Sequence, residues 1–107
     1  MSIQELSPMQ LQRWGEENKE FILLDVREDD EVKFSSLPYH LHIPMNLIPI
    51  RQNEIPDDKP IVIYCHHGVR SMQVALYLQA AGFEDLYNLT GGIDAWSLVI
   101  DPSMPRY

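Results

Sequence analysis

Short apolar runs alternate with longer mixed stretches along this chain, and the runs predict strands. The uninterrupted runs Phe21–Leu24 and Ile61–Tyr64 are typical of strands that are covered on both faces of a sheet. Two shorter runs, Leu41–Ile43 and Leu86–Leu89, also predict strands. The polar residues of Asp25-Val26-Arg27 follow the first run directly, so we expect that strand to carry functional groups at its carboxyl end.

The stretches between these runs predict helices. Ser7 followed by Pro8 is a typical helix start and predicts a short helix over about residues 8–17. The clearest helix extends over about residues 70–81 and is stopped by Gly82, and its apolar character nearly all round predicts that it is largely buried. Shorter helical segments are expected at residues 28–34, 46–51 and 93–99, and the tail 101–107 is expected to run extended along the surface.

The alternation of strands and helices favours an α/β fold with a parallel sheet flanked by helices on both faces. In such folds ligands bind beyond the carboxyl ends of the strands. The strand ends at Asp25 and Cys65 are therefore expected to open onto the same rim. The length of 107 residues predicts one domain, spanning residues 1–107.

Composition and charge narrow the range of partners. A single cysteine excludes an intramolecular disulfide, and with no apolar signal segment at the start we expect a soluble, cytoplasmic protein. No apolar stretch approaches the roughly 20 residues of a membrane span, so no membrane partner is expected. Sixteen acidic against eight basic residues give a net charge of -8, which makes nucleic acid an unfavourable partner.

The only cysteine, Cys65, lies between the strand at 61–64 and the clearest helix. The first amides of a helix have no internal partners and stabilise an anion in the preceding loop. A cysteine held there has its thiolate favoured over its thiol, and the thiolate is the reactive species. Gly68 allows the loop to curl tightly, and Arg70 adds a fixed positive charge. These features predict a nucleophile in preference to a structural cysteine packed in the core.

Four sequence blocks resemble the single-domain rhodanese-like sulfurtransferases. They occur in the family's order, cover nearly the whole chain, and are Leu23-Leu24-Asp25-Val26-Arg27-Glu28, His42-Ile43-Pro44-Met45-Asn46, Cys65-His66-His67-Gly68-Val69-Arg70-Ser71 and Leu89-Thr90-Gly91-Gly92-Ile93-Asp94-Ala95-Trp96. The resemblance implies the rhodanese-like fold, a five-stranded parallel sheet flanked by helices on both faces. It also implies that Cys65 is the catalytic residue and carries sulfane sulfur as a persulfide.

The implied reaction consists of two displacements at sulfur. The Cys65 thiolate takes the outer sulfur of a donor such as thiosulfate, and the persulfide then passes that sulfur to cyanide or a thiol. The expected partners are therefore a small sulfur donor and acceptor, with a sulfur-accepting protein as an alternative acceptor. Neither a metal nor an organic cofactor is needed. The substrate-binding loop is expected to comprise His66, His67, Gly68, Val69, Arg70 and Ser71.

Two features depart from the family's usual pattern. The Gly-His-Ile-Pro-Gly-Ala segment of the family is replaced by Ser35-Ser36-Leu37-Pro38-Tyr39-His40, in which both glycines are missing. We expect this replacement to alter the local backbone, the shape of the pocket and thereby substrate preference. Members specialised for thiosulfate commonly carry a positive residue directly after the cysteine, where this chain has the neutral His66. Strong thiosulfate activity therefore does not follow from the resemblance.

Two other functions stay open at this point. One is a sulfur-relay or regulatory module that binds a partner protein and turns over small donors poorly. The other is a phosphatase or arsenate reductase, because the dual-specificity phosphatases of the cell cycle resemble rhodaneses. Those phosphatases have five residues between the catalytic cysteine and arginine, whereas this chain has four between Cys65 and Arg70. The shorter loop favours sulfur transfer, because a tetrahedral phosphate needs a wider ring of amides.

Asp25 and Arg27 are candidate supporting residues on the same rim. Their functional interpretation is contact with the substrate or with the Cys65 loop. Their structural interpretation, which we favour, is an ion pair of Arg27 with Asp25 or Glu31.

A metal site is not expected from the histidines. His40 and His42 lie on one predicted strand face, and Cys65, His66 and His67 are adjacent in sequence. Adjacent ligands in a curled loop seldom converge on one ion, and neither set has the spacing of a CxxC or HxxxH pattern.

Overall fold

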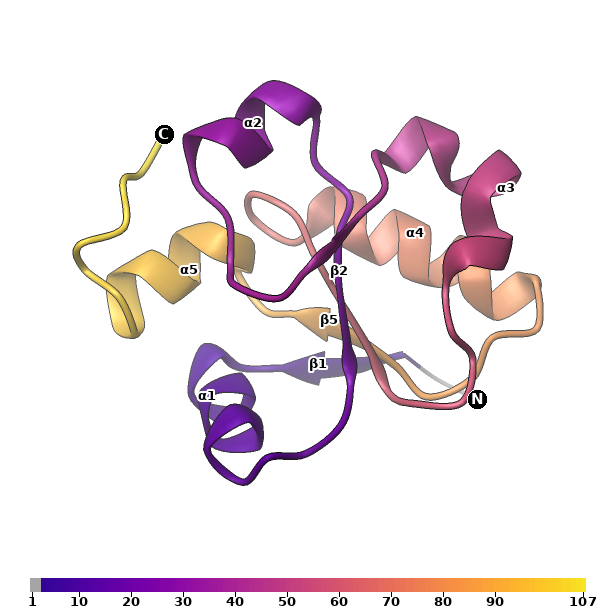
Figure 1. Ribbon diagram of the computed structural model, residues 1–107, viewed down its shortest axis with the longest axis horizontal. Coiled ribbons are helices and arrows are strands. Elements are labelled where there is room, and N and C mark those ends of the chain that lie inside the picture. The colour runs from indigo at the N-terminus through magenta and orange to yellow at the C-terminus, as the bar shows by residue number, and fades with distance from the viewer. Residues whose placement is uncertain (1–2) are drawn as a thin grey trace.

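A computed structural model of the protein describes residues 3–107 and contains one five-stranded parallel sheet (Figure 1). The strand order across the sheet is β1-β5-β4-β2-β3, and each neighbouring pair is parallel. This arrangement confirms the predicted α/β fold. The strands are β1 (Gln4–Leu6), β2 (Ile22–Asp25), β3 (Leu41–His42), β4 (Ile61–Tyr64) and β5 (Leu86–Leu89).

Helices cover both faces of the sheet (Figure 1). Helices α1 (Pro8–Glu16) and α5 (Gly92–Val99) pack on one face, where Leu11 and Ile93 join a cluster that contains Val62. The longest helix, α4 (Val69–Ala80), packs with α3 (Ile48–Arg51) on the other face. The remaining helical segments are α2 (Asp29–Phe34), η1 (Met45–Leu47) and η2 (Gln52–Glu54).

The central strand β4 is buried along its whole length, as its uninterrupted apolar run predicts. Val62 contributes to the cluster under α1 and α5, and Ile63 contributes to the cluster under α3 and α4. Successive side chains of a strand point to opposite faces, so one apolar run supplies both halves of the core. Cys65 follows directly and is itself 1% exposed.

Two expectations about the helices and the tail are wrong in part. Helix α4 buries Val74 and Leu78, but Leu76 is 53% exposed, because only one face of the helix meets the sheet and no further layer covers the other. The tail does not run extended throughout: the Met104 amide donates to the Asp101 carbonyl at 3.0 Å and closes a turn. Met104 then packs against the cluster under α1 and α5.

The predicted helical segment at 46–51 is present, although it is divided. A 3-10 turn, η1, leads into α3, and Pro49 lies in the first turn of that helix, where its missing amide hydrogen is not needed. Within residues 3–107, no helix is both long and apolar enough to span a membrane.

Candidate functional site

The carboxyl ends of β2 and β4 place Asp25 and Cys65 on the same edge of the sheet. Asp25 pairs with Tyr64 in the parallel register, and Cys65 is the next residue along β4's strand direction. The loop from Cys65 then curls through Gly68, which has φ +105 and caps the start of α4. This left-handed conformation favours glycine, as the sequence pattern predicts.

The Cys65 sulfur atom lies at the positive end of α4. Its Sγ accepts hydrogen bonds from the Gly68 amide at 3.0 Å and from the Ser71 amide at 3.4 Å. The Ser71 hydroxyl oxygen also lies 3.4 Å from Sγ. Amide hydrogens and the helix dipole together stabilise negative charge on this sulfur atom.

A buried polar network behind the sulfur holds the Ser71 hydroxyl. Ser71 Oγ donates to Asn88 Oδ1 on β5 at 2.5 Å. Asn88 Nδ2 in turn donates to the Gly68 carbonyl and to Glu5 Oε2, each at 3.2 Å. Asn88 therefore fixes both the serine hydroxyl and the glycine of the loop.

The N-terminus of α5 is hydrogen-bonded to the loop that follows β4. The Ile93 amide donates to the Cys65 carbonyl at 2.9 Å, and the Asp94 amide donates to the His66 carbonyl at 3.1 Å. A Cβ atom at Gly92, which has φ +63, would collide with both carbonyl groups. Close packing at this glycine turns the loop carbonyls toward α5 and leaves the loop amides free to face the sulfur.

The two loop histidines differ in their surroundings. The His66 ring lies between the His67 ring, with a centroid distance of 3.8 Å, and the Tyr107 ring, which stacks on it at 3.9 Å. Burial and the neighbouring His67 lower the pKa of His66, which favours the neutral form of its ring. His67 is 61% exposed, and its Nε2 lies 3.6 Å from Asp94 Oδ2.

Asp25 and Arg27 form an ion pair in which both side chains are fully buried. Arg27 Nη2 donates to Asp25 Oδ2 at 2.8 Å and to the Ser35 carbonyl at 2.6 Å, and its Nη1 donates to the Tyr107 hydroxyl at 2.9 Å. Burial disfavours the charged guanidinium, but the bonds to Asp25 and Tyr107 outweigh that effect and raise the pKa of Arg27. The pair holds the segment after β2 in place beside the Cys65 loop.

Arg70 is bound to Glu31, a carboxylate that the sequence suggested only as a possible partner of Arg27. Its Nη1 and Nη2 atoms donate to the two oxygens of Glu31 on α2, at 2.7 and 2.8 Å. Figure 1 shows α2 beside the loop that joins β4 to α4. The positive charge expected to attract an anionic donor therefore already has a partner within the protein.

Among the described residues, three side chains that could act as metal ligands lie close together. Donor atoms of His66, His67 and Asp94 lie within 4.8 Å of one another, and Cys65 is not in this group. The Asp94 carboxylate is already bonded to Arg106, at 2.9 and 3.3 Å.

His40 and His42, the other histidines weighed as metal ligands, each bond a backbone carbonyl. His40 Nδ1 lies 2.7 Å from the Leu37 oxygen, and His42 Nε2 lies 2.7 Å from the Arg27 oxygen. The first contact lies within the segment that precedes β3, and the second joins the end of β3 to the segment that follows β2.

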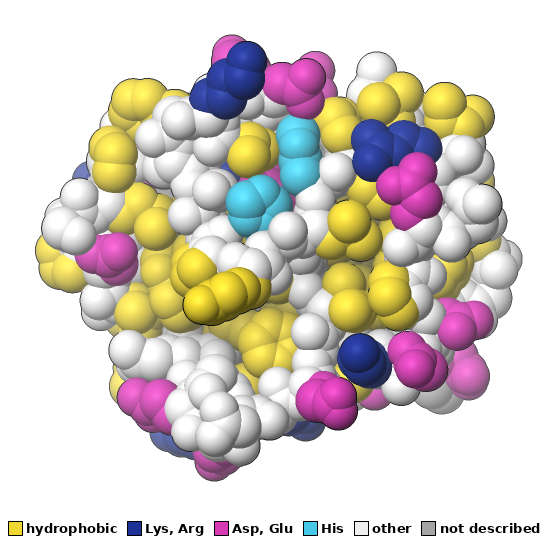
Figure 2. Space-filling view, viewed as in Figure 1, with side chains coloured by type: hydrophobic (Ala, Val, Ile, Leu, Met, Phe, Trp, Pro, Cys, Tyr) yellow, Lys and Arg dark blue, Asp and Glu magenta, His cyan; other side chains and the backbone are white. Residues whose placement is uncertain are grey.

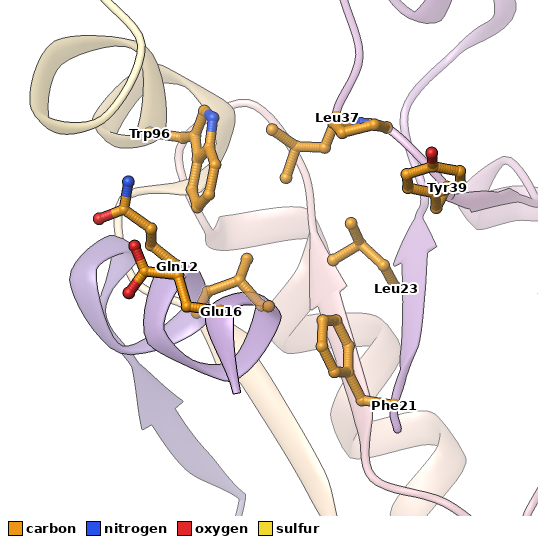
Figure 3. Close-up of a pocket in the computed structure, with 10 residues that line it drawn as sticks. Gln12, Glu16, Phe21, Leu23, Leu37, Tyr39 and Trp96 are labelled. Carbon is orange, nitrogen blue, oxygen red and sulfur yellow. The ribbon is translucent and has the colours of Figure 1, made fainter. Parts of the chain in front are cut away.

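An apolar pocket of about 430 Å³ lies between α1, β2 and α5, and Figure 3 shows Trp96 and Leu37 on opposite sides of it. Figure 2, which views the molecule from the same side as Figure 1, shows the corresponding hollow among hydrophobic side chains. Leu37, Pro38 and the fully exposed Tyr39 line it, so the segment that departs from the family's pattern shapes this pocket. Cys65 is not among the lining residues.

Sequence reasoning missed four residues that complete the site. Asn88 had a signal, because a polar side chain in a buried strand needs a partner. Glu31 was considered only as a possible partner of Arg27, Asp94 was named only within the fourth block of the resemblance, and nothing local marks Tyr107. Their roles depend on contacts between segments far apart in the chain.

Comparison with known proteins identifies the family. The rhodanese-like domain family model matches residues 7–98. A sulfurtransferase of Allochromatium vinosum is 43% identical over 81 residues, which cover 76% of this chain and 76% of that protein. The putative sulfurtransferase YtwF of Bacillus subtilis is 41% identical over 96 residues, covering 90% and 92% of the two chains.

A solved structure gives the same result. The crystal structure of a rhodanese-like domain protein from Staphylococcus aureus matches with a TM-score of 0.84 and 31% identity, over 98% of this chain and 99% of that one. This chain belongs to the rhodanese-like domain family. Its sulfurtransferase relatives support a rhodanese-type enzyme of sulfur transfer.

Proposed function

We propose that this protein transfers sulfane sulfur through a persulfide on Cys65. The observation that carries the proposal is the convergence of the Gly68 and Ser71 amides on Cys65 Sγ at the start of α4. These amides point at the sulfur atom whose thiolate form would attack the donor. The sulfurtransferase names of the relatives support sulfur transfer as the reaction class.

In the first half-reaction, the Cys65 thiolate attacks the outer sulfur of the donor. With thiosulfate as donor, a new S–S bond forms to Cys65, the S–S bond of thiosulfate breaks, and sulfite leaves with the bonding electrons. The product is a Cys65 persulfide whose terminal sulfur is negatively charged. The amides of Gly68 and Ser71 are placed to stabilise that charge.

In the second half-reaction, an acceptor attacks the terminal sulfur. Cyanide forms a C–S bond, the S–S bond to Cys65 breaks, and thiocyanate leaves while the thiolate is regenerated. A thiol acceptor would leave as its own persulfide by the same displacement. The side chain of His67 is 61% exposed and Val69 is 68% exposed, and both lie beside Gly68. We therefore assign them contact with the donor or the acceptor.

Thiocyanate production tests the proposal. The purified protein is mixed with cyanide and with either thiosulfate or cysteamine persulfide as donor, and Cys65→Ser serves as the matched variant. The proposal predicts thiocyanate formation with at least one donor and its loss in Cys65→Ser. Equal turnover by the Ser variant would overturn the assignment of Cys65.

A further inference from the structure

The charge of Arg70, at the start of α4, is already paired, because both its terminal nitrogens donate to the Glu31 carboxylate. The Glu31 side chain is 16% exposed and that of Arg70 is 30% exposed, so the pair is partly shielded from water. Its bond to Glu31 is the main cause that raises the pKa of Arg70, and the nearby Cys65 and Tyr107 add to that effect. Arg70 directly precedes Ser71, whose amide donates to Cys65 Sγ at 3.4 Å, so the Arg70–Glu31 pair belongs to the surroundings of this sulfur atom.

Contacts from three segments hold the Glu31 carboxylate in place. Besides the two hydrogen bonds from Arg70, the carboxylate accepts one from the Glu28 amide at 3.0 Å and one from the Tyr107 hydroxyl at 2.8 Å. These donors, led by Arg70, lower the pKa of Glu31 to about 2. The carboxylate is therefore fixed and ionised over the whole physiological pH range.

The other charged groups around the loop are paired as well. Arg27 is bonded to Asp25, and Arg106 is bonded to Asp94. The lowered pKa of His66 favours its neutral form, and the whole chain has a net charge of -8. An anion that approaches Cys65 therefore meets three neutralised pairs at short range and a negative protein at long range.

We propose that Glu31 is a specificity-determining residue that makes the Cys65 site prefer sulfur donors without a net negative charge over dianionic ones. This inference rests on the proposed function and specifies its donor class. Thiosulfate must either displace Glu31 from Arg70 or bind beside its negative charge. A small persulfide that also carries an ammonium group has no such penalty.

Both donors load the sulfur by balanced displacements. From thiosulfate, Cys65 gains the outer sulfur and sulfite leaves. From a persulfide R–S–SH, the Cys65 thiolate takes the terminal S–H group, the donor's S–S bond breaks, and R–S⁻ leaves with the electron pair. No oxidant or reductant enters either step. The leaving groups differ in reactivity, so recognition of the donor is measured by the change in the ratio of the two rates between wild type and variant.

The test compares the loading rates of two donors in the whole protein. The probes are thiosulfate and cysteamine persulfide, and the measured quantity is the second-order rate constant for Cys65 persulfide formation. Glu31→Gln removes the negative charge at the site. Glu54→Gln is the matched control, because Glu54 bonds Arg51 at 2.9 and 3.0 Å in a similar two-point ion pair on the surface of η2.

Glu31→Gln is expected to raise the ratio of the thiosulfate to the cysteamine persulfide rate constant by about tenfold or more, as expected for removing one nearby charge. Glu54→Gln is expected to leave the ratio unchanged. An unchanged or lower ratio in a folded Glu31→Gln protein would overturn the inference. If Glu31→Gln does not fold, Tyr107→Phe removes one donor to Glu31 and is expected to shift the ratio in the same direction by less, and no shift in it overturns the inference.

The same experiment distinguishes failure of the proposed function from failure of the role assigned to Glu31. If neither donor loads sulfur onto wild-type protein that is folded and reduced, the persulfide carrier itself is refuted, and the donor preference falls with it. If both donors load Cys65 and Glu31→Gln leaves their ratio unchanged, the carrier stands and only the role of Glu31 is refuted.

Discussion

The hydroxyl of Ser71 donates a hydrogen bond to Asn88 Oδ1 at 2.5 Å while its oxygen lies 3.4 Å from Cys65 Sγ. A hydroxyl has one hydrogen, so Ser71 cannot donate to both atoms at once. With Cys65 as a thiol, Ser71 serves as the acceptor. With Cys65 as a thiolate or persulfide, rotation of the hydroxyl would give the sulfur a third donor beside the two amides.

Ser71→Ala tests this arrangement. The change removes a partner of the sulfur and leaves Asn88 Oδ1 buried without its donor, which is expected to cost about 1–3 kcal/mol in the free energy of unfolding. Sulfur transfer is expected to slow by about tenfold to a hundredfold, since one donor to a developing charge is lost. Urea unfolding and the steady-state rate of thiocyanate formation measure the two effects.

Ser97→Ala provides the control for that variant. Ser97 is also buried, and its hydroxyl donates to the Asp94 carbonyl at 2.8 Å within α5. Its loss is expected to leave the rate unchanged. Wild-type sulfur transfer by Ser71→Ala would show that the hydroxyl takes no part.

Gly92→Ala tests the support that α5 gives to the loop. The new Cβ would meet the carbonyl groups of Cys65 and His66, and the residue would have to keep φ +63, a conformation that costs a non-glycine residue about 1–3 kcal/mol. We expect a lower melting temperature and loss of most sulfur transfer. Gly15→Ala is the control, because a Cβ at Gly15 meets nothing within 4 Å and stabilises a helix. A Gly92→Ala protein as stable and active as wild type would contradict the account of the loop.

Asp25→Asn tests the structural interpretation of the buried ion pair. Removing the carboxylate charge leaves Arg27 buried without its counter-ion, and breaking such a pair costs about 3–5 kcal/mol in the free energy of unfolding. Chemical denaturation of the variant measures this loss. Asp25→Asn with wild-type stability and impaired donor binding would instead support a direct contact with substrate.

The stability contributed by Glu31 is expected to depend on pH. Its pKa is lowered from the ordinary 4.5 to about 2 by the bonds from Arg70, Glu28 and Tyr107. A lowered pKa means that the stabilisation is fully present above pH 4.5 and is lost as the pH falls through about 2. The charged groups that face it, Arg70 and Arg27, keep their charge over this range, and Tyr107 has a pKa raised to about 12.

The measurement is the difference in free energy of unfolding between wild type and Glu31→Gln at several pH values. We expect a difference of about 2 kcal/mol at neutral pH that shrinks between pH 4.5 and 2. Glu54→Gln, on an exposed pair, is expected to show little difference at any of these values. A difference for Glu31→Gln that grows on acidification would contradict the assigned pKa direction.

The fold was predictable where burial leaves a local pattern. The runs at β2 and β4 are apolar because both faces of a central strand are covered, and the start of α1 is marked by Ser7 and Pro8. Strand β1 was not predicted, because only Leu6 of its three residues is buried and an edge strand of that length has no periodicity.

The site was predictable only as far as it is local. Cys65, Gly68 and Ser71 lie close together in the chain, in the loop before α4 and in the first turn of that helix, so the sequence brings them together by itself. The partners Asn88 and Glu31 are 17 and 39 residues from the loop residues that they bond. Such contacts follow from the order of strands in the sheet, which a sequence pattern does not specify.

The most direct test of the persulfide carrier is the intact mass of the protein after incubation with a donor and before any acceptor is added. Wild-type protein is treated with thiosulfate or cysteamine persulfide, and Cys65→Ser is treated in parallel. The account predicts that wild type gains the mass of one sulfur atom, that cyanide removes it as thiocyanate, and that Cys65→Ser gains nothing. A folded, reduced wild-type protein that gains no sulfur from either donor, or a Cys65→Ser variant that gains it equally, would contradict the account.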